Sequence, residues 1–452
     1  MFLRSPSGRP MLLPRSRFFL LLTISIVLYV YRFFIAGVNV SLFRLVVLGW
    51  TVTFVVDLLR GRQHLDRRYL PLAAAFVGLF IVNAIDFLLL SGYPALRRDI
   101  ANHLFNLWFA GLLAIYVDNS SKLVSLVKAF VLSSIVTTAI TAYSAAFDHV
   151  PFEGLIRTFA SDLSRGLSYI NDDTVFRRAT SSFFDPNFYG IYSMLAAISA
   201  CWLWLYDRPR RWIAACFAVN LFCLTLTLSR TAVIGLLAGF ATFFALDRRA
   251  RVFTTCAAGA TLVMLYLCTA LQSHAVWKYV DDQLAAMGAH SIARPTAARS
   301  DASHVSAAPG ASAALSHAEA RASDVGSVEL RMAYIDRGLA VFRSSPIWGQ
   351  GSASLLTETN HWSSAHLTYL TVLARYGVIG SLIYGTFMLY PILTVSTTAA
   401  PAGERMLVLS SLGSLLVVYL SYDVFFFFEV QYLFFGISWA VALHKIGWQS
   451  RT

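Results

Sequence analysis

Long apolar runs separated by short polar stretches dominate the sequence from Phe18 onward. A helix that crosses a bilayer needs roughly 20 mostly apolar residues, and most of these runs approach that length. The pattern predicts an all-α, polytopic membrane protein of about twelve transmembrane helices. The predicted spans are residues 18–36, 40–59, 69–90, 103–117, 123–147, 187–205, 212–228, 231–247, 252–271, 366–394, 406–422 and 425–443.

Composition supports the same class. The chain is 57% hydrophobic and 13% charged, whereas soluble domains are roughly half apolar and a quarter charged. The net charge of +12 is typical of basic cytoplasmic loops, and no Lys/Arg block with interleaved aromatics predicts a nucleic-acid partner. The five cysteines lie in apolar runs, so we expect small buried residues and no disulfide framework.

The short basic loops set the expected orientation. Placing the N-terminus in the cytoplasm, as an uncleaved first span, puts Arg60, Arg208, Arg248 and the C-terminal tail inside. Residues 1–271 then hold nine spans and a periplasmic loop near 148–186. Residues 272–365 form a large periplasmic loop with short helices, in which the Ala/Ser-rich segment 285–326 is expected to be flexible. Residues 366–452 hold three spans and a cytoplasmic tail.

Arg230 stands between two apolar runs with almost no loop to separate them. An arginine so near hydrocarbon is costly unless it faces a polar cavity or an anion. Guanidinium binds phosphate in a bidentate manner, so a phosphate clamp is the favoured interpretation. The alternative is a turn arginine that extends its side chain to the interface.

The stretch from Glu329 to Gly385 combines a cationic helix, a Pro/Gly loop and histidines just before an apolar run. Arg331 and Arg337 belong to a helix expected to lie on the membrane surface; the alternative is that both charges are simply solvated. His366 begins a span and can accept a proton near neutral pH. A structural role for this histidine, or Glu329 or Glu358 as the base, stays open.

The first external loop ends at Asp185-Pro186-Asn187. Proline favours the first turn of a helix, so a helix is predicted to begin near Pro186 or Asn187, with its N-terminus available to an anion. The alternative is a capped span with interfacial aromatic residues. The sequence has no acidic pair and no histidine pair with metal-ligand spacing, so we expect no metal and no cofactor.

Three stretches, in order, resemble the bacterial O-antigen ligase and O-antigen polymerase superfamily. They are the loop from Arg178 to Asn187, the Ser229-Arg230 turn, and the block that runs from Arg331 through Pro346, Gly349-Gln350-Gly351 and His366 to Gly377-Val378-Ile379-Gly380. The resemblance covers roughly residues 170–390 by motif. The family often has His-Asn where this chain has His366-Leu367, which makes His361 a second candidate.

The resemblance implies a fold like that of the C-type membrane glycosyltransferases and a metal-independent glycosyltransferase in the bacterial inner membrane. The donor would be a glycan on undecaprenyl diphosphate at the periplasmic face. The acceptor would be a second glycan or a lipid A-core sugar, in O-antigen or exopolysaccharide assembly. Arg230 and Arg331, aided by Arg178 and Arg337, would stabilise the diphosphate, and His366 would act as base. The rival prediction is a flippase or transporter of lipid-linked glycans; ligase and polymerase stay open.

Overall fold

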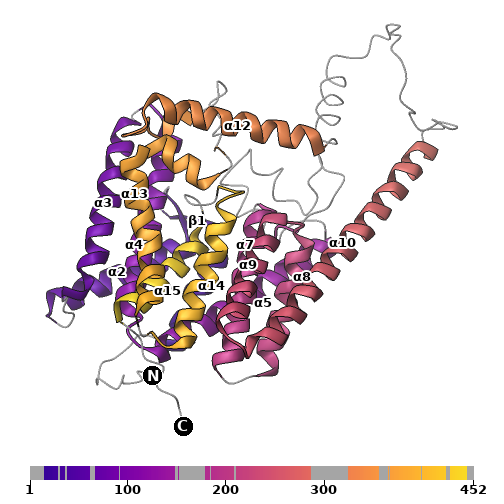
Figure 1. Cartoon of the computed structure of the whole chain (residues 1–452), viewed down its shortest axis with the longest axis horizontal. Helices are drawn as coiled ribbons and strands as arrows, with labels where there is room; N and C mark the ends of the chain where they lie inside the picture. The colour runs from indigo at the N-terminus through magenta and orange to yellow at the C-terminus, as the bar shows by residue number, and fades with distance from the viewer. Residues whose placement is uncertain are drawn as a thin grey trace, which may run out of the picture.

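Helices form nearly all of the described chain in the computed structural model of this protein (Figure 1). The described residues are 15–28, 31–35, 38–61, 67–90, 92–147, 151, 179–183, 185–207, 210–286, 324–355, 365, 367–398, 400–423 and 428–444. The α-helices are α1 (Arg15–Val27), α2 (Leu42–Leu59), α3 (Leu70–Leu89), α4 (Pro94–Tyr116), α5 (Ser120–Phe147), α7 (Pro186–Tyr206), α8 (Arg211–Leu226), α9 (Arg230–Leu246), α10 (Ala250–Ala286), α12 (Asp324–Ser344), α13 (Thr368–Thr397), α14 (Ala402–Val418) and α15 (Glu429–His444). Two short 3-10 turns are η1 (Arg67–Tyr69) and η2 (Ser352–Leu355).

Apolar helices embed the protein in a membrane. Within the described residues, six helical segments are long and apolar enough to cross a bilayer, and three shorter apolar helices accompany them. The six are 42–59, 67–89, 120–144, 186–206, 250–267 and 368–397. The predicted helical membrane architecture is confirmed, apart from one short hairpin, whereas the count of twelve spans and the periplasmic placement of the long loops stay predictions.

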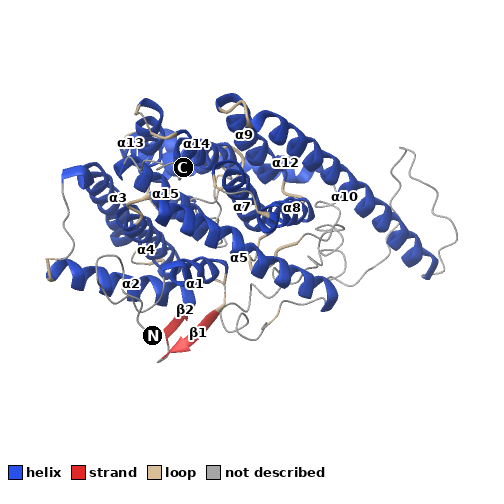
Figure 2. Cartoon of the chain, turned by 90° about the horizontal axis from the view of Figure 1, so that it is seen from below, coloured by secondary structure: helices blue, strands red, loops and turns tan. Residues whose placement is uncertain are grey.

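A β-hairpin replaces the end of the first predicted span. Strands β1 (Arg32–Ile35) and β2 (Val38–Ser41) pair antiparallel with Arg32 opposite Ser41, and they lie at one edge of the bundle (Figure 2). The prediction of a helix over 18–36 is therefore wrong beyond Val27, and the described chain is not purely α. Hydropathy alone does not separate a short apolar strand from a helix. Ser41 then caps α2, because its side chain accepts the Arg44 N–H.

Two helices extend beyond the predicted spans because charged residues occupy their ends. Helix α4 begins at Pro94, nine residues before the predicted start at 103, and its first turns carry Arg97 and Arg98. Helix α10 continues to Ala286, so the predicted domain boundary at 271/272 falls inside a helix. Most of the predicted flexible segment, residues 287–323, lies outside the described residues.

Helix α7 forms the centre of the bundle, since 89% of its most apolar window is buried, against 17% for α2. Small residues allow its neighbours to approach closely, as is common between membrane helices. A Cβ on Gly436 of α15 would lie 2.9 Å from the Ala110 carbonyl oxygen of α4. The expectation of buried cysteines holds for Cys201, Cys216 and Cys223, but Cys256 on α10 is exposed.

Candidate functional site

Four helix ends meet at one end of the bundle. Helices α7, α9 and α13 begin there, and α14 ends there. We call the meeting point the helix-end junction and define it as residues 185–187, 229–231, 365, 367–371 and 419–423. Side-chain hydrogen bonds between these four segments hold it together.

Arg230 is the first residue of α9, and its side chain is exposed. The chain reaches it through a tight turn, in which Leu228 has a φ of 50° and the Ser229 side chain caps the helix by accepting the Ala232 N–H. The turn packs closely on α7, because a Cβ on Gly190 would lie 2.9 Å from the Ser229 Cβ. The predicted two-helix turn with arginine at its exit is therefore observed.

Asn187 and the arginine turn are in direct contact. The Ser229 hydroxyl donates to Asn187 Oδ1 at 3.0 Å. The helix α7 begins at Pro186, as predicted, and Asp185 caps it by accepting the Asn187 N–H at 2.6 Å. The other carboxylate oxygen of Asp185 accepts the Tyr422 hydroxyl at 2.5 Å. Thus α7 is linked to α9 on one side and to the end of α14 on the other.

The start of α13 is held by Asp423, which is 8% exposed. Its Oδ2 accepts the Thr371 hydroxyl at 2.8 Å, and Thr371 Oγ1 in turn accepts the Ala365 N–H at 3.3 Å. The Thr368 hydroxyl donates to the Tyr422 carbonyl at 2.9 Å. Because Ala365 directly precedes the predicted base, this network fixes the chain on both sides of position 366. Sequence reasoning missed Asp423, although an acid between two apolar runs is the same signal that pointed to Arg230.

Helix α12 runs across the bundle ends (Figure 1) and brings Arg337 to the junction. Arg337 is half-buried, and the next residue, Gly338, lies against Ala365 and Leu370, with a Cβ there only 2.9 Å from the Ala365 Cβ. Arg331 is on the same helix, about 9 Å further along the axis at 1.5 Å per residue. The side chain of Arg331 is not among those that the structure describes.

Three predicted site residues, His366, His361 and Arg178, lie outside the described residues. Their chain neighbours are placed. Ala365 and Leu367 flank His366 within the junction, and Ala179, which follows Arg178, donates its N–H to the Leu226 carbonyl at 3.0 Å. That carbonyl ends α8, four residues before Arg230. The described neighbours of two of the three residues therefore lie at or beside the junction.

Helix N-termini and arginines contribute positive charge at the junction. The N-terminus of a helix carries a partial positive charge, and α7, α9 and α13 all begin here. Arg230 and Arg337 add two guanidinium groups, while Asp185 and Asp423 are both engaged in hydrogen bonds with neighbouring helices. Within the described residues, no cluster of three or more His, Cys, Asp or Glu side chains could hold a metal ion.

A second group of buried polar residues lies between α3, α4, α13 and α15, and sequence reasoning missed it. His103 contacts the hydroxyls of Tyr432 and Tyr384 at 2.5 and 2.9 Å. Asp86 and Arg375 are each 2% exposed. Single polar residues inside long apolar runs gave no spacing from which this cluster could be predicted.

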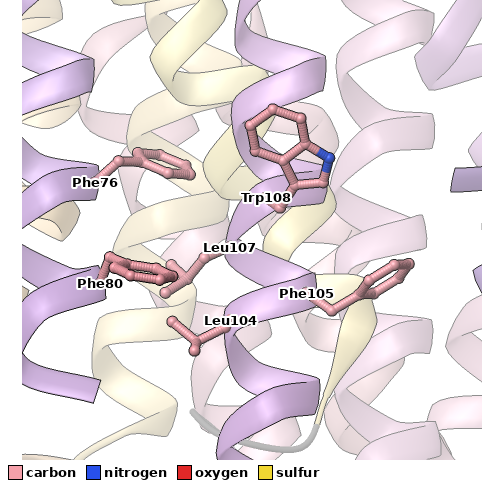
Figure 3. Close-up of a pocket in the computed structure, with 6 residues that line it drawn as sticks. All are labelled: Phe76, Phe80, Leu104, Phe105, Leu107 and Trp108. Carbon is pink, nitrogen blue, oxygen red and sulfur yellow. The ribbon is translucent and has the colours of Figure 1, made fainter. Parts of the chain in front are cut away.

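A cavity of about 390 Å³ lies between α3 and α4 and not at the junction (Figure 3). All of its lining side chains are apolar or aromatic: Phe76, Phe80, Leu104, Phe105, Leu107 and Trp108. Such a lining suits hydrocarbon and offers no group for acid–base or phosphate chemistry.

Comparison with known families matches residues 215–385 to the family model described as O-antigen ligase. The match includes Arg230, Arg331, Arg337, His361 and His366, and it ends before Asp423. No curated protein matches the chain. The resemblance inferred from the motifs is thereby confirmed for this domain, which indicates a ligase- or polymerase-type role in glycan assembly.

Proposed function

From the premise that this membrane protein carries an O-antigen ligase domain, related to that family over residues 215–385, we propose that it is a glycosyltransferase. It moves a glycan from undecaprenyl diphosphate to a sugar acceptor at the periplasmic face of the inner membrane. The product is O-antigen or a related exopolysaccharide. The reaction uses no metal and no nucleotide sugar.

The observation that carries this proposal is the helix-end junction. Arg230 is exposed at the first turn of α9. The hydroxyl of Ser229, the residue before Arg230, lies 3.0 Å from Asn187 Oδ1. Three helix N-termini meet at the junction. A sugar diphosphate gains negative charge on its leaving oxygen as the glycosidic bond breaks. Cationic groups and helix dipoles placed in advance around that oxygen stabilise the transition state more than the ground state.

The proposed chemistry is a single displacement. The acceptor hydroxyl oxygen attacks the anomeric carbon, the bond from that carbon to the diphosphate oxygen breaks, and undecaprenyl diphosphate leaves. His366 accepts the hydroxyl proton as the new bond forms, with His361 as the second candidate. Attack opposite the leaving group inverts the anomeric centre. Arg230 and Arg331, with Arg178 and Arg337, hold the diphosphate.

The decisive experiment uses membranes from a strain that lacks the gene, with and without the restored protein. A lipid-diphosphate-linked repeat unit is supplied, and the products are separated on a gel. A ladder on the same lipid identifies a polymerase, and attachment to lipid A-core identifies a ligase. Movement of the substrate across the bilayer with no new glycosidic bond would overturn the proposal in favour of a transporter.

A further inference from the structure

Helix α13 is interrupted near the junction, at Gly377. This residue has φ 61° and ψ −165°, which are not helical, so α13 consists of two helical halves that meet at a kink. A break of this kind leaves carbonyl groups of the first half and N–H groups of the second half without helical partners. Inside a membrane protein such groups must be satisfied by other parts of the chain.

The loop after α12 satisfies both sides of the break. Pro346 and Ile347 accept the N–H groups of Val378 and Ile379 at 2.8 and 3.2 Å. On the other side, the N–H groups of Gln350 and Gly351 donate to the carbonyls of Ala374 and Arg375 at 3.1 and 2.8 Å. This backbone pairing, which we call the loop clamp (residues 346–351 with 374–379), ties the end of α12 to the middle of α13.

Close backbone contact explains two glycines of the clamp. A Cβ on Gly349 would lie 2.3 Å from the Arg375 carbonyl oxygen, and one on Gly377 would lie 2.3 Å from the Ile347 carbonyl oxygen. Both residues also have positive φ angles, 73° and 61°. Any side chain at either position would force the loop away from the helix.

Asp86 of α3 anchors the clamp at its end. Its Oδ1 accepts the Ser352 N–H at 2.9 Å, and its Oδ2 accepts the Ser352 hydroxyl at 2.5 Å. The carboxylate therefore caps η2, and the side chain is 2% exposed. The approach is tight, since a Cβ on Gly351 would lie 3.0 Å from Asp86 Oδ1. An acidic side chain within a spanning helix is costly, and here its two oxygens are committed to the loop.

We propose that Asp86 is a positioning residue for the glycosyl-transfer site. By holding Ser352, it fixes the clamp, and the clamp fixes α12 against α13, so that Arg337 and the chain at Ala365 keep their separation. The inference rests on the proposed function for its catalytic readout. Its structural part does not, because the contact between Gly338 of α12 and Ala365 can be measured without activity.

The catalytic test compares Asp86→Ala, Ser352→Ala and the double variant, with rates expressed per folded protein. Alanine is used because asparagine can still accept the Ser352 N–H and donate to its hydroxyl oxygen. A displacement of about 1 Å at the site can lower a rate by roughly 100-fold, so we expect Asp86→Ala to lower kcat at least about tenfold with little change in KM. Ser352→Ala keeps its backbone N–H and should lose less. The double variant should lose no more than Asp86→Ala alone, because both changes break one contact.

Asp57→Ala is the control, because Asp57 lies near the C-terminal end of α2, the helix that precedes α3 in the chain. It should leave kcat unchanged. Equal losses of kcat in the two Asp→Ala variants, or additive losses in the double variant, would overturn the positioning role of Asp86.

The structural test forms a disulfide between Gly338→Cys and Ala365→Cys in a cysteine-free background. The two Cβ positions would lie 2.9 Å apart, somewhat closer than the roughly 3.8 Å of a disulfide, so a small adjustment allows rapid oxidation. Asp86→Ala should slow oxidation several-fold while Asp57→Ala does not. An unchanged oxidation rate in Asp86→Ala would overturn the inference. If oxidation of the double-cysteine protein depends on Asp86 but the wild-type protein shows no transfer, the proposed function fails and the clamp stands.

Discussion

Arg230 is the side chain whose replacement tests the proposed diphosphate site most directly, since it is exposed at the first turn of α9. We expect Arg230→Ala to lower transfer roughly 100- to 1,000-fold, the usual effect of removing one charge-stabilising group. Arg230→Lys should recover only part of the rate, because lysine lacks bidentate geometry. The measurement is product formation per folded protein. Arg248→Ala, just beyond the other end of α9, is the control. A fully active Arg230→Ala would refute a role of Arg230 in binding the diphosphate.

Thr371 tests the network around position 366. Its hydroxyl donates to Asp423 and accepts from the Ala365 N–H, so Thr371→Val leaves two buried groups without that partner. Such groups cost about 1–3 kcal/mol each. We expect lower thermal stability and a lower transfer rate, measured by unfolding in detergent and by product formation. Thr386→Val, on the exposed face of the same helix, should change neither, and equal effects at the two sites would contradict the role of the network.

At the scale of secondary structure, the helix break in α13 gives a sharp contrast between two glycines of one helix. Gly377→Ala places a Cβ 2.3 Å from the Ile347 carbonyl oxygen at a positive φ. We expect a loss of several kcal/mol of stability, since the unfavourable backbone conformation alone costs about 1–3 kcal/mol. Gly385 has nothing within 4 Å of its would-be Cβ, so Gly385→Ala should be neutral or stabilise the helix by up to about 1 kcal/mol. Melting curves of the two variants in detergent measure these changes in stability.

The starts of α7 and α9 could be predicted because their signals are local. Pro186 predicted the start of α7, which begins there, and α9 begins at Arg230, one residue before the predicted span 231–247. The hairpin at 32–41 could not be predicted in this way, because Phe33, Phe34 and Ile35 continue the apolar run of the first predicted span. The break at Gly377 also escaped prediction, because it depends on a loop about 30 residues earlier. Local pattern does not report such a tertiary contact.

In the candidate site too, sequence alone reveals some residues and not others. Arg230 and Asn187 stood out in the sequence, and they meet through Ser229. Asp423 and Asp86 did not, because each acts through a partner distant in sequence, Asp86 through Ser352. A single acidic residue in an apolar run indicates that its carboxylate has a hydrogen-bond partner, but only the fold shows which residue that partner is.

For the whole molecule, the remaining prediction is which face of the membrane carries the helix-end junction. His444 at the end of α15 donates its Nε2–H to the Ala114 carbonyl, 3.0 Å away, and its ring lies 5.7 Å from that of Tyr69. The end of α15, the end of α4 and the start of α3 therefore share one face.

Helix α9 runs from the junction at Arg230 to Leu246, so the basic loop at Arg248 lies on the face opposite the junction. The positive-inside rule places that loop in the cytoplasm.

Single cysteines in a cysteine-free background test this topology. Arg343→Cys, near the end of α12, and Arg248→Cys both replace exposed side chains. A membrane-impermeant maleimide applied to intact spheroplasts should label Arg343→Cys and should reach Arg248→Cys only after the membrane is permeabilised. The reverse pattern would put the junction on the cytoplasmic face. Transfer of a periplasmic glycan at the junction would then be impossible, whatever the activity of the arginine variants.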